Sequence, residues 1–559
     1  MATSSRWSRY AATKYSLVVL WLSGCGVLFW RTYRYYKYEP SFYYVHQILG
    51  SCLCLSRASA AVLNLTCGMA VLPVCRVTVT TLRHFNAKMK LRTMRMLLDC
   101  CKGFHICCAY LIVGTSMVHF SAHMWNARNF SMYYNHVIRD VNAALYQDQD
   151  PLWILLQTVP GVTGFLMMIL LSLIVSSSVT NIRNVNYDLF WYCHRLFVLF
   201  YVLLLVHALK GPIRKQINVN SHTPGCPIKN ITSGNMTLLP ETRQEPIPEA
   251  EYNFGTACDD NPRFTQIGCY SWLWVSGPLL VYVCDTVYRF TRRLTQVKLV
   301  AVKNHPCDVV ELQLERPGFA AKPGQFILLQ CPRISTFEWH PFSLTMCPVS
   351  ERPSFSVHIR ARGDWSEKLR KLLLNSHDRL ENEAVENMRH CLRVDGPFCS
   401  PMEDVRKYRV LLCIAGGIGV TPFISLLTAI RDSKKWTRKL HRVCLVWMCR
   451  EYESFGCFQE LIESCHAQCW QDNRPDLFDI RFHCTGHALT RHQNDFVKKR
   501  LCHGRPNWKD IFSHMKTIHK RFDTGVFCCG PRGLVTDVKY WCHELSSQPN
   551  RFFFYHESY

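Results

Sequence analysis

The sequence predicts a multidomain fold in which a six-helix transmembrane bundle precedes an antiparallel β-barrel and an α/β domain. Three observations predict it. Long apolar runs fill the first half of the 559-residue chain, the next hundred residues alternate as paired strands do, and strand and helix patterns alternate from about residue 405 onward. We therefore expect three domains, at 1–290, 291–400 and 401–559.

Six apolar segments approach the roughly 20 residues that cross a bilayer as a helix. They lie at 13–30, 44–74, 103–125, 153–179, 189–210 and 271–290. Basic residues gather between the second and third segments and after the sixth: Arg76, Arg83, Lys88, Lys90, Arg92, Arg95, Arg289, Arg292, Arg293 and Lys298. The positive-inside rule makes that side cytosolic, and six crossings place both termini there too.

The formal net charge of the chain is +24. Cytosolic loops, anionic lipid headgroups and an anionic cosubstrate account for such a charge. A nucleic-acid partner needs a basic face with aromatic stacking or a known module, and the sequence offers neither. We therefore expect a lipid bilayer, and no nucleic acid, as a partner.

A long loop at about 211–270 falls on the opposite face of the membrane in this topology. Most of the 30 cysteines lie in spans or in the cytosolic half, where thiols stay reduced, but Cys226, Cys258 and Cys269 lie in this loop. A bridge between Cys226 and Cys258 is one open pairing, which spacing does not establish. The sequons at Asn230 and Asn235 fit an extracellular or lumenal face.

Histidines recur at matched depths in the third and fifth segments. His105 and His119 are 14 residues apart, roughly 21 Å along a helix, whereas His194 and His207 are 13 residues apart, roughly 19.5 Å. Ionisable groups at membrane depth are usually functional, and facing imidazoles in a bundle are natural axial ligands of haem iron. We infer an inner haem on His105 and His194, with polar helix contacts as the alternative. The outer haem would take His119 and His207.

The spacing of the fifth segment raises one difficulty. At about 100° per residue, 13 residues do not restore the helix face that 14 residues restore. A local distortion, such as a π-bulge, would restore it. Nearby, Arg57 in the second segment is expected either to pair with a haem propionate or to reach the interface, and His123 is expected to be interfacial.

The first part of the cytosolic half reads as a small antiparallel barrel. Strand-like runs at 297–315 and 324–332 precede a strand that begins HPFSL at His340. A second strand then carries His358 and Arg360 and meets a Gly-Asp-Trp turn at Gly363 before a helix. His358, Arg360 and Gly363 at this spacing after His-Pro-Phe-Ser indicate a binding site more strongly than His-Pro-Phe-Ser alone does.

The last part of the chain reads as an open α/β sheet. YRVLLCIAGGIGVTPF is a buried strand, a glycine turn and a helix, the layout in which helix N-terminal amides hold phosphates. Later strands end at Arg450 and at Cys529, and ligands bind at such strand ends in open sheets. Arg450 is therefore a candidate for a cofactor's 2′-phosphate, or else a solvated charge.

Four intramembrane histidines together with HPFSL, GGIGVTPF and FCCGP resemble the NADPH oxidase family over nearly the whole chain. Shorter stretches, LCLSRASA, NARNFS, SHTPGC and QDNRPD, look like one isoform of that family in particular. The resemblance implies a ferric reductase-like bundle with two b haems, an FAD-binding β-barrel and an NADPH-binding α/β domain of ferredoxin-reductase type.

The resemblance also implies cofactor-binding residues by position. On the FAD side they are His340, Pro341, Phe342, Ser343, His358, Arg360, Gly363, Asp364 and Trp365. On the NADPH side they are Gly416, Gly417, Gly419, Thr421, Pro422, Arg450, Cys529, Gly530 and Pro531. The family usually has Thr where this chain has Ser343, which keeps the hydroxyl, and Tyr559 would shield the flavin.

The expected chemistry follows from electron counting. NADPH gives up two electrons as hydride and haem accepts one, so flavin is expected to split the pair before electrons cross both haems to molecular oxygen. Since imidazole fills both axial positions, the product would be superoxide. His222 in the outer loop is expected to donate a proton that favours release of hydrogen peroxide, or else to be an exposed residue without a role.

Two other functions stay open from the sequence. A ferric or cupric reductase would use the same parts with a metal ion as acceptor, and a channel or transporter would use the nucleotide domain only for regulation. The resemblance further implies a small membrane partner subunit. We expect an integral protein of the endoplasmic reticulum or the plasma membrane.

Overall fold

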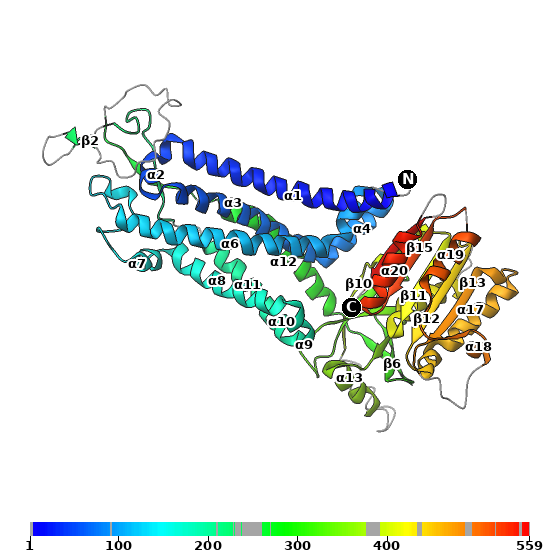
Figure 1. The fold of residues 1–559 in the computed structure, drawn as a ribbon. Coiled ribbons are helices and arrows are strands. Elements are labelled where there is room, and N and C mark those ends of the chain that lie inside the picture. The colour runs from blue at the N-terminus through cyan, green and yellow to red at the C-terminus, as the bar shows by residue number, and fades with distance from the viewer. Residues whose placement is uncertain are drawn as a thin grey trace. The chain divides into compact units, whose positions relative to one another are not determined.

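The structure is a computed structural model that describes residues 4–89, 92–207, 209, 211–226, 228–229, 236–237, 260–268, 270–375, 392–432, 439–486, 495–519, 521–546 and 551–557. The chain divides into two compact units (Figure 1). The helical unit comprises Thr13–Cys75 and Arg92–Cys284, and the sheet unit comprises Met1–Ala12, Arg76–Leu91 and Asp285–Tyr559. The three predicted domain ranges stay a prediction, because this division does not separate the two sheets.

Long and short helices together build the helical unit. They are α1 (Ser4–Tyr38), α2 (Tyr43–Leu49), α3 (Ser51–Val71), α5 (Arg92–Asp99), α6 (Cys101–Met132), α7 (Pro151–Leu156), α8 (Val159–Ser178), α9 (Thr180–Val185), α10 (Tyr187–Arg195), α11 (Phe197–His207) and α12 (Ser271–Arg293). Their starts follow local chemistry. Thr158, for example, caps α8 because its Oγ1 accepts from the Gly161 amide at 3.1 Å, with Pro160 in the first turn.

Five helical stretches are long and apolar enough to cross a membrane: Tyr15–Tyr38, Ser51–Val74, Cys101–Met132, Val159–Ser178 and Tyr187–His207. They correspond to the first five predicted segments. The sixth predicted segment is also helical, as α12, but among the described residues it is not apolar enough to join the other five. The count of six spans therefore stays a prediction.

The fifth span is broken between two helices, which explains how His194 and His207 can face the same way although they are 13 residues apart. α10 ends at Arg195 and α11 begins at Phe197, with Leu196 between them at φ −60° and ψ −12°. The expected distortion is thus a turn between two short helices and not a π-bulge. It changes the rotational phase of the helix between His194 and His207, so both can face α6.

A small sheet follows the fifth span. β1 (Arg214–Gln216) pairs antiparallel with β4 (Phe264–Gln266), and the short strands β2 (Ile228–Lys229) and β3 (Met236–Thr237) pair with each other. Cys226 is disulfide-bonded. The residues Cys258, Cys269, Asn230 and Asn235, on which predictions were made, lie outside the described residues.

The first sheet of the sheet unit is antiparallel, with strand order β10-β7-β8-β9-β6-β5. Its strands are β5 (Lys298–His305), β6 (Val309–Glu315), β7 (Phe326–Gln330), β8 (His340–Met346), β9 (Phe355–Arg360) and β10 (Arg393–Phe398). α13 (Asp364–Asn375) follows β9. The antiparallel prediction is confirmed, but no pairing that closes a barrel is found between the described strands.

The second sheet is parallel throughout, with strand order β14-β13-β12-β11-β15-β16. Its strands are β11 (Val410–Gly416), β12 (Arg442–Cys449), β13 (Phe478–Cys484), β14 (Leu501–His503), β15 (Thr524–Cys529) and β16 (Phe552–Glu557). Its helices are α15 (Thr421–Asp432), α17 (Gln459–Gln471), α18 (Asp495–Lys498), α19 (Trp508–Ile518) and α20 (Arg532–Glu544). The predicted α/β pattern is confirmed.

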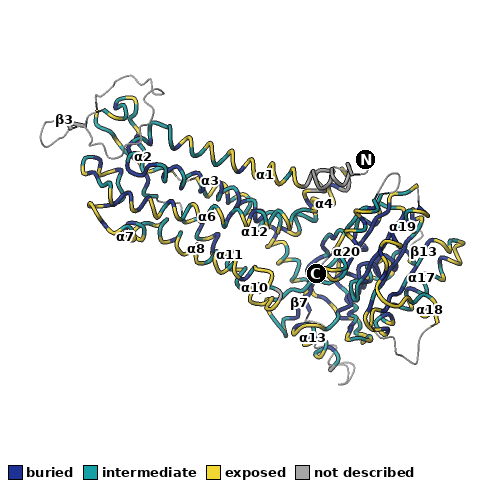
Figure 2. The backbone as a smooth tube through the Cα atoms, in the orientation of Figure 1, coloured by how far each residue is buried: buried dark blue, intermediate teal, exposed yellow. Residues whose placement is uncertain are grey.

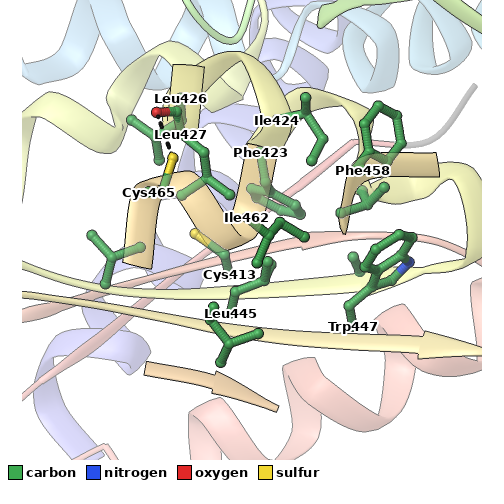
Figure 3. Close-up of a cluster of buried hydrophobic side chains, with 14 of the residues drawn as sticks. Cys413, Phe423, Ile424, Leu426, Leu427, Leu445, Trp447, Phe458, Ile462 and Cys465 are labelled. Atoms are coloured by element: carbon green, nitrogen blue, oxygen red, sulfur yellow. Dashed lines mark hydrogen bonds between the residues drawn. The ribbon is translucent and has the colours of Figure 1, made fainter. Parts of the chain in front are cut away.

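An apolar core lies between this parallel sheet and its helices. Figure 3 shows Phe423, Ile424 and Leu427 of α15 packed toward Trp447 of β12 and Ile462 of α17. Each of these five side chains is almost completely buried. The core fixes the strand ends, where the site described below lies.

A buried ion cluster joins the end of α12 to the antiparallel sheet. Arg289 Nε and Arg293 Nη2 lie 2.9 and 2.7 Å from Oδ2 of Asp395, and Arg292 Nε lies 3.1 Å from Oδ1. Burial of Asp395 raises the pKa of its carboxyl, but the three guanidinium groups outweigh burial, so the pKa lies below its ordinary value. The arginines that predicted a cytosolic membrane boundary thus also anchor β10.

Candidate functional site

Four histidines of the helical unit form two facing pairs. The rings of His105 on α6 and His194 on α10 have centroids 6.3 Å apart. The rings of His119 on α6 and His207 at the end of α11 are also 6.3 Å apart. The structure therefore brings together the pairs that matched depth predicted.

Hydrogen bonds at Nδ1 orient three of these rings. The acceptors are the Ala70 carbonyl for His105 (2.8 Å), the Ser56 carbonyl for His119 (2.9 Å) and Thr163 Oγ1 for His207 (2.8 Å). A carbonyl only accepts, and the Thr163 hydroxyl already donates to the Val159 carbonyl, so the acceptors assign the proton to Nδ1. Nε2 then keeps a lone pair, as a metal ligand must.

The separation of the rings tests whether haem iron fits between them. A metal–imidazole bond of about 2 Å and the roughly 1 Å from ring nitrogen to ring centroid place two opposed imidazoles about 6 Å apart across one metal. Both observed separations are 6.3 Å. The donor set of two imidazoles in each pair also fits a haem, and three of the four rings are oriented by hydrogen bonds, so the residues present match the group.

Two charged or polar neighbours complete the outer pair. Arg57 on α3 follows Ser56, the residue that orients His119; its guanidinium carbon lies 5.2 Å from the Tyr36 ring centroid. Arg57 Nε is buried and has no hydrogen-bond partner in the described parts of the chain, which fits an anionic group such as a propionate. The ring of His123, expected at the interface, packs on His119 at 4.6 Å.

His222 is completely buried, so it is not the exposed loop residue of the alternative interpretation. Its Nδ1 donates to the Asp260 carbonyl at 2.7 Å. Its Nε2 therefore accepts from the Tyr44 hydroxyl at 2.6 Å. The ring joins the segment after the fifth span to α2, and Nε2 has no proton to give in this tautomer.

An aromatic face on β8 and α13 gathers part of the predicted FAD set. The ring of His340 stacks on the Trp365 indole with centroids 4.1 Å apart, and the ring of Phe342 lies 6.2 Å from the same indole. Trp365 Nε1 is buried without a hydrogen-bond partner among the described residues. A flat aromatic surface with an unmet N–H donor fits a flavin ring. Pro341, which lies between His340 and Phe342, pairs with β7, and Ser343, which follows Phe342, is buried.

His358 and Arg360 lie on one face of β9. Nδ1 of His358 is 2.9 Å from Thr345 Oγ1, and burial lowers the pKa of this histidine to about 4, so the ring is neutral at pH 7. Arg360 reaches the end of β12, where it lies 3.7 Å from the Glu451 carboxylate. Of His358 and Arg360, only Arg360 carries a positive charge at pH 7 with which to bind a phosphate at the end of β9.

The start of α13 is already capped. The amides of Arg362 and Gly363 both donate to Ser366 Oγ, at 3.0 and 3.1 Å. Asp364 opens the helix with Trp365 beside it. The predicted turn exists, but two of its amides are engaged within the turn.

Two glycine turns meet at the centre of the parallel sheet. β11 and β15 are neighbours, and the next elements leave them in opposite directions, toward β12 and toward β16. A Cβ on Gly419 would lie 2.4 Å from the Cys529 carbonyl oxygen, and a Cβ on Gly530 would lie 3.2 Å from the Gly416 Cα. Only glycine allows this approach, and such a switch point is where open α/β sheets bind ligands.

The remaining predicted NADPH residues surround this point. Gly417 has φ +58°, and its carbonyl accepts from Trp447 Nε1 at 2.9 Å. The others lie at helix starts and strand ends: Thr421 and Pro422 open α15, Pro531 precedes α20, Cys529 ends β15 and exposed Arg450 follows β12. Tyr559 lies outside the described residues.

Comparison with known proteins agrees with this arrangement. Residues 63–205 match the ferric reductase like transmembrane component, residues 294–402 an FAD-binding domain and residues 408–543 the ferric reductase NAD binding domain. NADPH oxidase 4 of Homo sapiens is 40% identical, with 99% of this chain and 98% of the relative covered. The chain belongs to the NADPH oxidase family.

Within this family, the chain is more similar to one of the two human isoforms compared than to the other. Human NADPH oxidase 3 is 32% identical over 97% of this chain and 98% of its own, so the fourth isoform is the nearer of the two, as the local stretches predicted. Among solved structures, a ferredoxin NADP+ reductase from Neisseria gonorrhoeae with bound FAD and NADP covers 47% of this chain and 98% of its own at 15% identity and a TM-score of 0.34.

The enzyme is therefore a transmembrane NADPH oxidase that generates reactive oxygen, with FAD- and NAD(P)-binding domains. The transmembrane match is consistent with haem. The metalloreductase and channel functions that the sequence left open are not favoured, because NADPH oxidases 4, 3 and 1 each match nearly the whole chain.

Sequence reasoning missed the residues that orient the site. Ala70 and Ser56 act through backbone carbonyls, which leave no signal in residue identity. Trp447 and Tyr44 are contributed by segments far along the chain from Gly417 and His222. Only Thr163 had a signal of its own, as a hydroxyl within an apolar span.

Proposed function

We propose that this NADPH oxidase holds two haems on His105 with His194 and on His119 with His207, and passes electrons from NADPH through FAD to molecular oxygen on the opposite face. The observation that carries the proposal is the geometry of the two imidazole pairs, each separated by 6.3 Å. When bound, NADPH supplies hydride, FAD divides the electron pair and haem iron carries single electrons.

The histidines do more than hold iron in this proposal. Two imidazoles would fill both coordination positions that a bound haem iron offers, so these residues would keep oxygen from binding to the metal, and superoxide is the expected product. The Ala70, Ser56 and Thr163 acceptors keep the rings in the ligating tautomer. Arg57 places a positive charge where a propionate would neutralise it.

The sheet unit supplies the binding surfaces for the two other cofactors. His340, Pro341, Phe342 and Ser343 on β8 and Trp365 on α13 would hold the flavin ring, and Arg360 its phosphates, with His358, Gly363 and Asp364 framing the strand end. Gly416, Gly417, Gly419, Thr421, Pro422, Cys529, Gly530 and Pro531 would shape the NADPH turn. Exposed Arg450 would take the 2′-phosphate.

Haem content measured on substituted full-length protein tests the pairing. We expect each of the four single substitutions to Leu to remove about half of the reduced-minus-oxidised haem signal, because one ligand of one haem is lost. Replacing both histidines of one pair should remove no more than either alone, whereas one from each pair should remove nearly all. His514→Leu, at an exposed position on α19, is the control; full haem content in every variant would refute the proposal.

Peroxide release is the second part of the proposal and concerns His222. Because Nε2 of His222 accepts from Tyr44, a proton would reach superoxide only by way of the Tyr44 hydroxyl or after His222 is protonated. His222→Gln should lower the ratio of peroxide to superoxide, and Tyr44→Phe should lower it too. His136→Gln, at an exposed position after α6, controls for loss of a histidine. An unchanged ratio in both test variants would remove the role of His222.

The surroundings of the enzyme are also part of the proposal. We infer cytosolic termini and a small membrane partner subunit, in the endoplasmic reticulum or plasma membrane, from the basic residues between the second and third spans and from the family. Epitope accessibility in sealed and permeabilised cells tests the orientation, and co-purification of a small membrane protein tests the partner.

A further inference from the structure

His84, Cys399 and Glu403 meet in the sheet unit, outside the cofactor sites. Their ligand-type atoms all lie within 4.8 Å of one another. Cys399 Sγ is 3.7 Å from His84 Nε2. His84 lies on α4 (Arg76–Met89), which follows the second span, whereas Cys399 and Glu403 lie at the end of β10 and in the 3₁₀ helix η5 (Pro401–Lys407). The three come from two segments more than 300 residues apart in the chain.

We propose that His84, Cys399 and Glu403 bind a divalent transition-metal cation, zinc above all, that clamps α4 to the connection between the two sheets. One imidazole, one thiolate and one carboxylate are the ligand types that zinc takes, with a fourth position for water. Zinc bonds of about 2.0–2.3 Å in a tetrahedron separate a thiolate sulfur from an imidazole nitrogen by roughly 3.5 Å. The observed 3.7 Å needs almost no movement.

The carboxylate ligand is held by a partner of its own. Gln325 Nε2 donates to Glu403 Oε1 at 3.1 Å, and Gln325 Oε1 accepts from the Lys322 amide at 2.9 Å. These two bonds fix the direction of the Gln325 amide, whose side chain is buried. Such a partner orients a metal ligand and restricts it to one position.

The two segments that carry the ligands are also held independently of any metal. The backbone N and the hydroxyl of Thr78, near the start of α4, donate to Asp285 Oδ1 at 2.8 and 3.0 Å. The Arg76 guanidinium carbon lies 5.8 Å from the ring centroid of Phe398, the residue before Cys399. The ligands are therefore brought together by the fold, which lowers the entropic cost of binding a cation.

Cys399 would exchange a proton for the metal. Burial and the neighbouring Glu403 carboxylate raise the pKa of this thiol to about 12. Its Sγ lies 4.0 Å from the Thr80 carbonyl, to which the S–H donates. Binding replaces the S–H bond by a metal–sulfur bond and releases one proton to solvent.

Zinc binding to the full-length, haem- and flavin-loaded enzyme tests the site. After chelator treatment, equilibrium binding of radioactive zinc should show one tight site in the native chain. Cys399→Ser and His84→Asn should each weaken that site at least tenfold, with haem and flavin content unchanged as proof of folding. Cys502→Ser, at an exposed position on β14, should leave it unaltered.

Glu311→Gln is the decisive control, because His305, Glu311 and His358 form the other cluster of metal-type ligands among the described residues. Zinc binding that is lost in Glu311→Gln and kept in Cys399→Ser would overturn the proposal. So would a native chain that binds no zinc. These outcomes do not depend on electron transfer and leave the proposed function untouched.

Alkylation of Cys399 supplies a second measurement. Zinc should slow maleimide labelling of Cys399 at pH 8 at least tenfold in the native chain, since the thiolate is then coordinated. The same zinc concentration should have no effect on that labelling in His84→Asn. Equal labelling with and without zinc in the native chain would overturn the proposal.

Discussion

Two helices, one from each unit, expose their apolar side chains to very different extents (Figure 2 colours the backbone by burial). On α8 of the helical unit, Leu166, Ile169 and Leu173 are 44%, 47% and 46% exposed. On α15 of the sheet unit, Ile424 and Leu427 are each 2% exposed. The residue types are the same, so the difference lies in the solvent, which is lipid around the first helix and water around the second.

The difference between lipid and water as solvent explains where the polar side chains of each unit lie. Lipid is as apolar as leucine, so the helical unit gains little by turning every leucine inward, and its interior holds polar groups beside buried apolar clusters. The facing histidines and Arg57 occupy that interior. In the sheet unit, water drives apolar side chains between the parallel sheet and its helices, and the predicted binding residues lie at strand ends.

We expect the largest loss of stability when the sheet unit loses the charged group that it buries, the Asp395 carboxylate. Asp395→Asn should destabilise the sheet unit by about 3–5 kcal/mol, because three arginines lose their buried counter-ion. The native-state pKa of Asp395 is depressed, so its contribution is complete above the unfolded pKa and is lost as pH falls through the lower folded pKa.

Thermal unfolding followed by flavin fluorescence from pH 7 down to pH 3 measures both effects. The native enzyme should lose stability at the acid end more steeply than Asp395→Asn, which has no carboxylate to protonate. Asp432→Asn, a partly exposed ion-pair partner of Arg352, is the control and should change little. Equal stabilities of native enzyme and Asp395→Asn at pH 7 would contradict the expectation.

A matched pair of truncations tests the comparison itself. Leu427→Ala on α15 should cost about 2–5 kcal/mol, because it leaves a cavity in a dry core. Ile169→Ala on α8 should change stability by no more than about 0.5 kcal/mol, because lipid fills the space. Flavin fluorescence reports on the first variant and haem absorbance on the second; similar losses in both would show that α8 faces protein.

A more modest loss of stability is expected at the glycine turn of the parallel sheet. Gly419→Ala should cost about 1–3 kcal/mol and raise the KM for NADPH, because its Cβ would lie 2.4 Å from the Cys529 carbonyl oxygen. Gly533→Ala, which meets no atom within 4 Å, is the control on α20. Steady-state kinetics with intact haem content measure the effect, and an unchanged KM would place NADPH elsewhere.

The sequence predicts those features of this enzyme that depend on local pattern. Apolar length revealed five membrane helices, glycine and strand patterns revealed both sheets, and residue spacing revealed which histidines pair. Features that depend on distant segments were not predictable. The fifth span breaks at Leu196, where no glycine or proline marks the break. The burial of His222 depends on Tyr44, and the arginine cluster depends on Asp395, about a hundred residues further along the chain.

The acceptors that orient His105 and His119 have a consequence for genetics. Both are main-chain carbonyls of α3, at Ala70 and Ser56. No substitution at either position deletes a main-chain carbonyl. A scan of point mutants along α3 would therefore detect the effect of side-chain size, but it would not detect that α3 orients the two rings. Thr163, which does the same for His207 with a hydroxyl, would stand out in such a scan. Shifting α3 by one residue would misdirect two imidazoles at once.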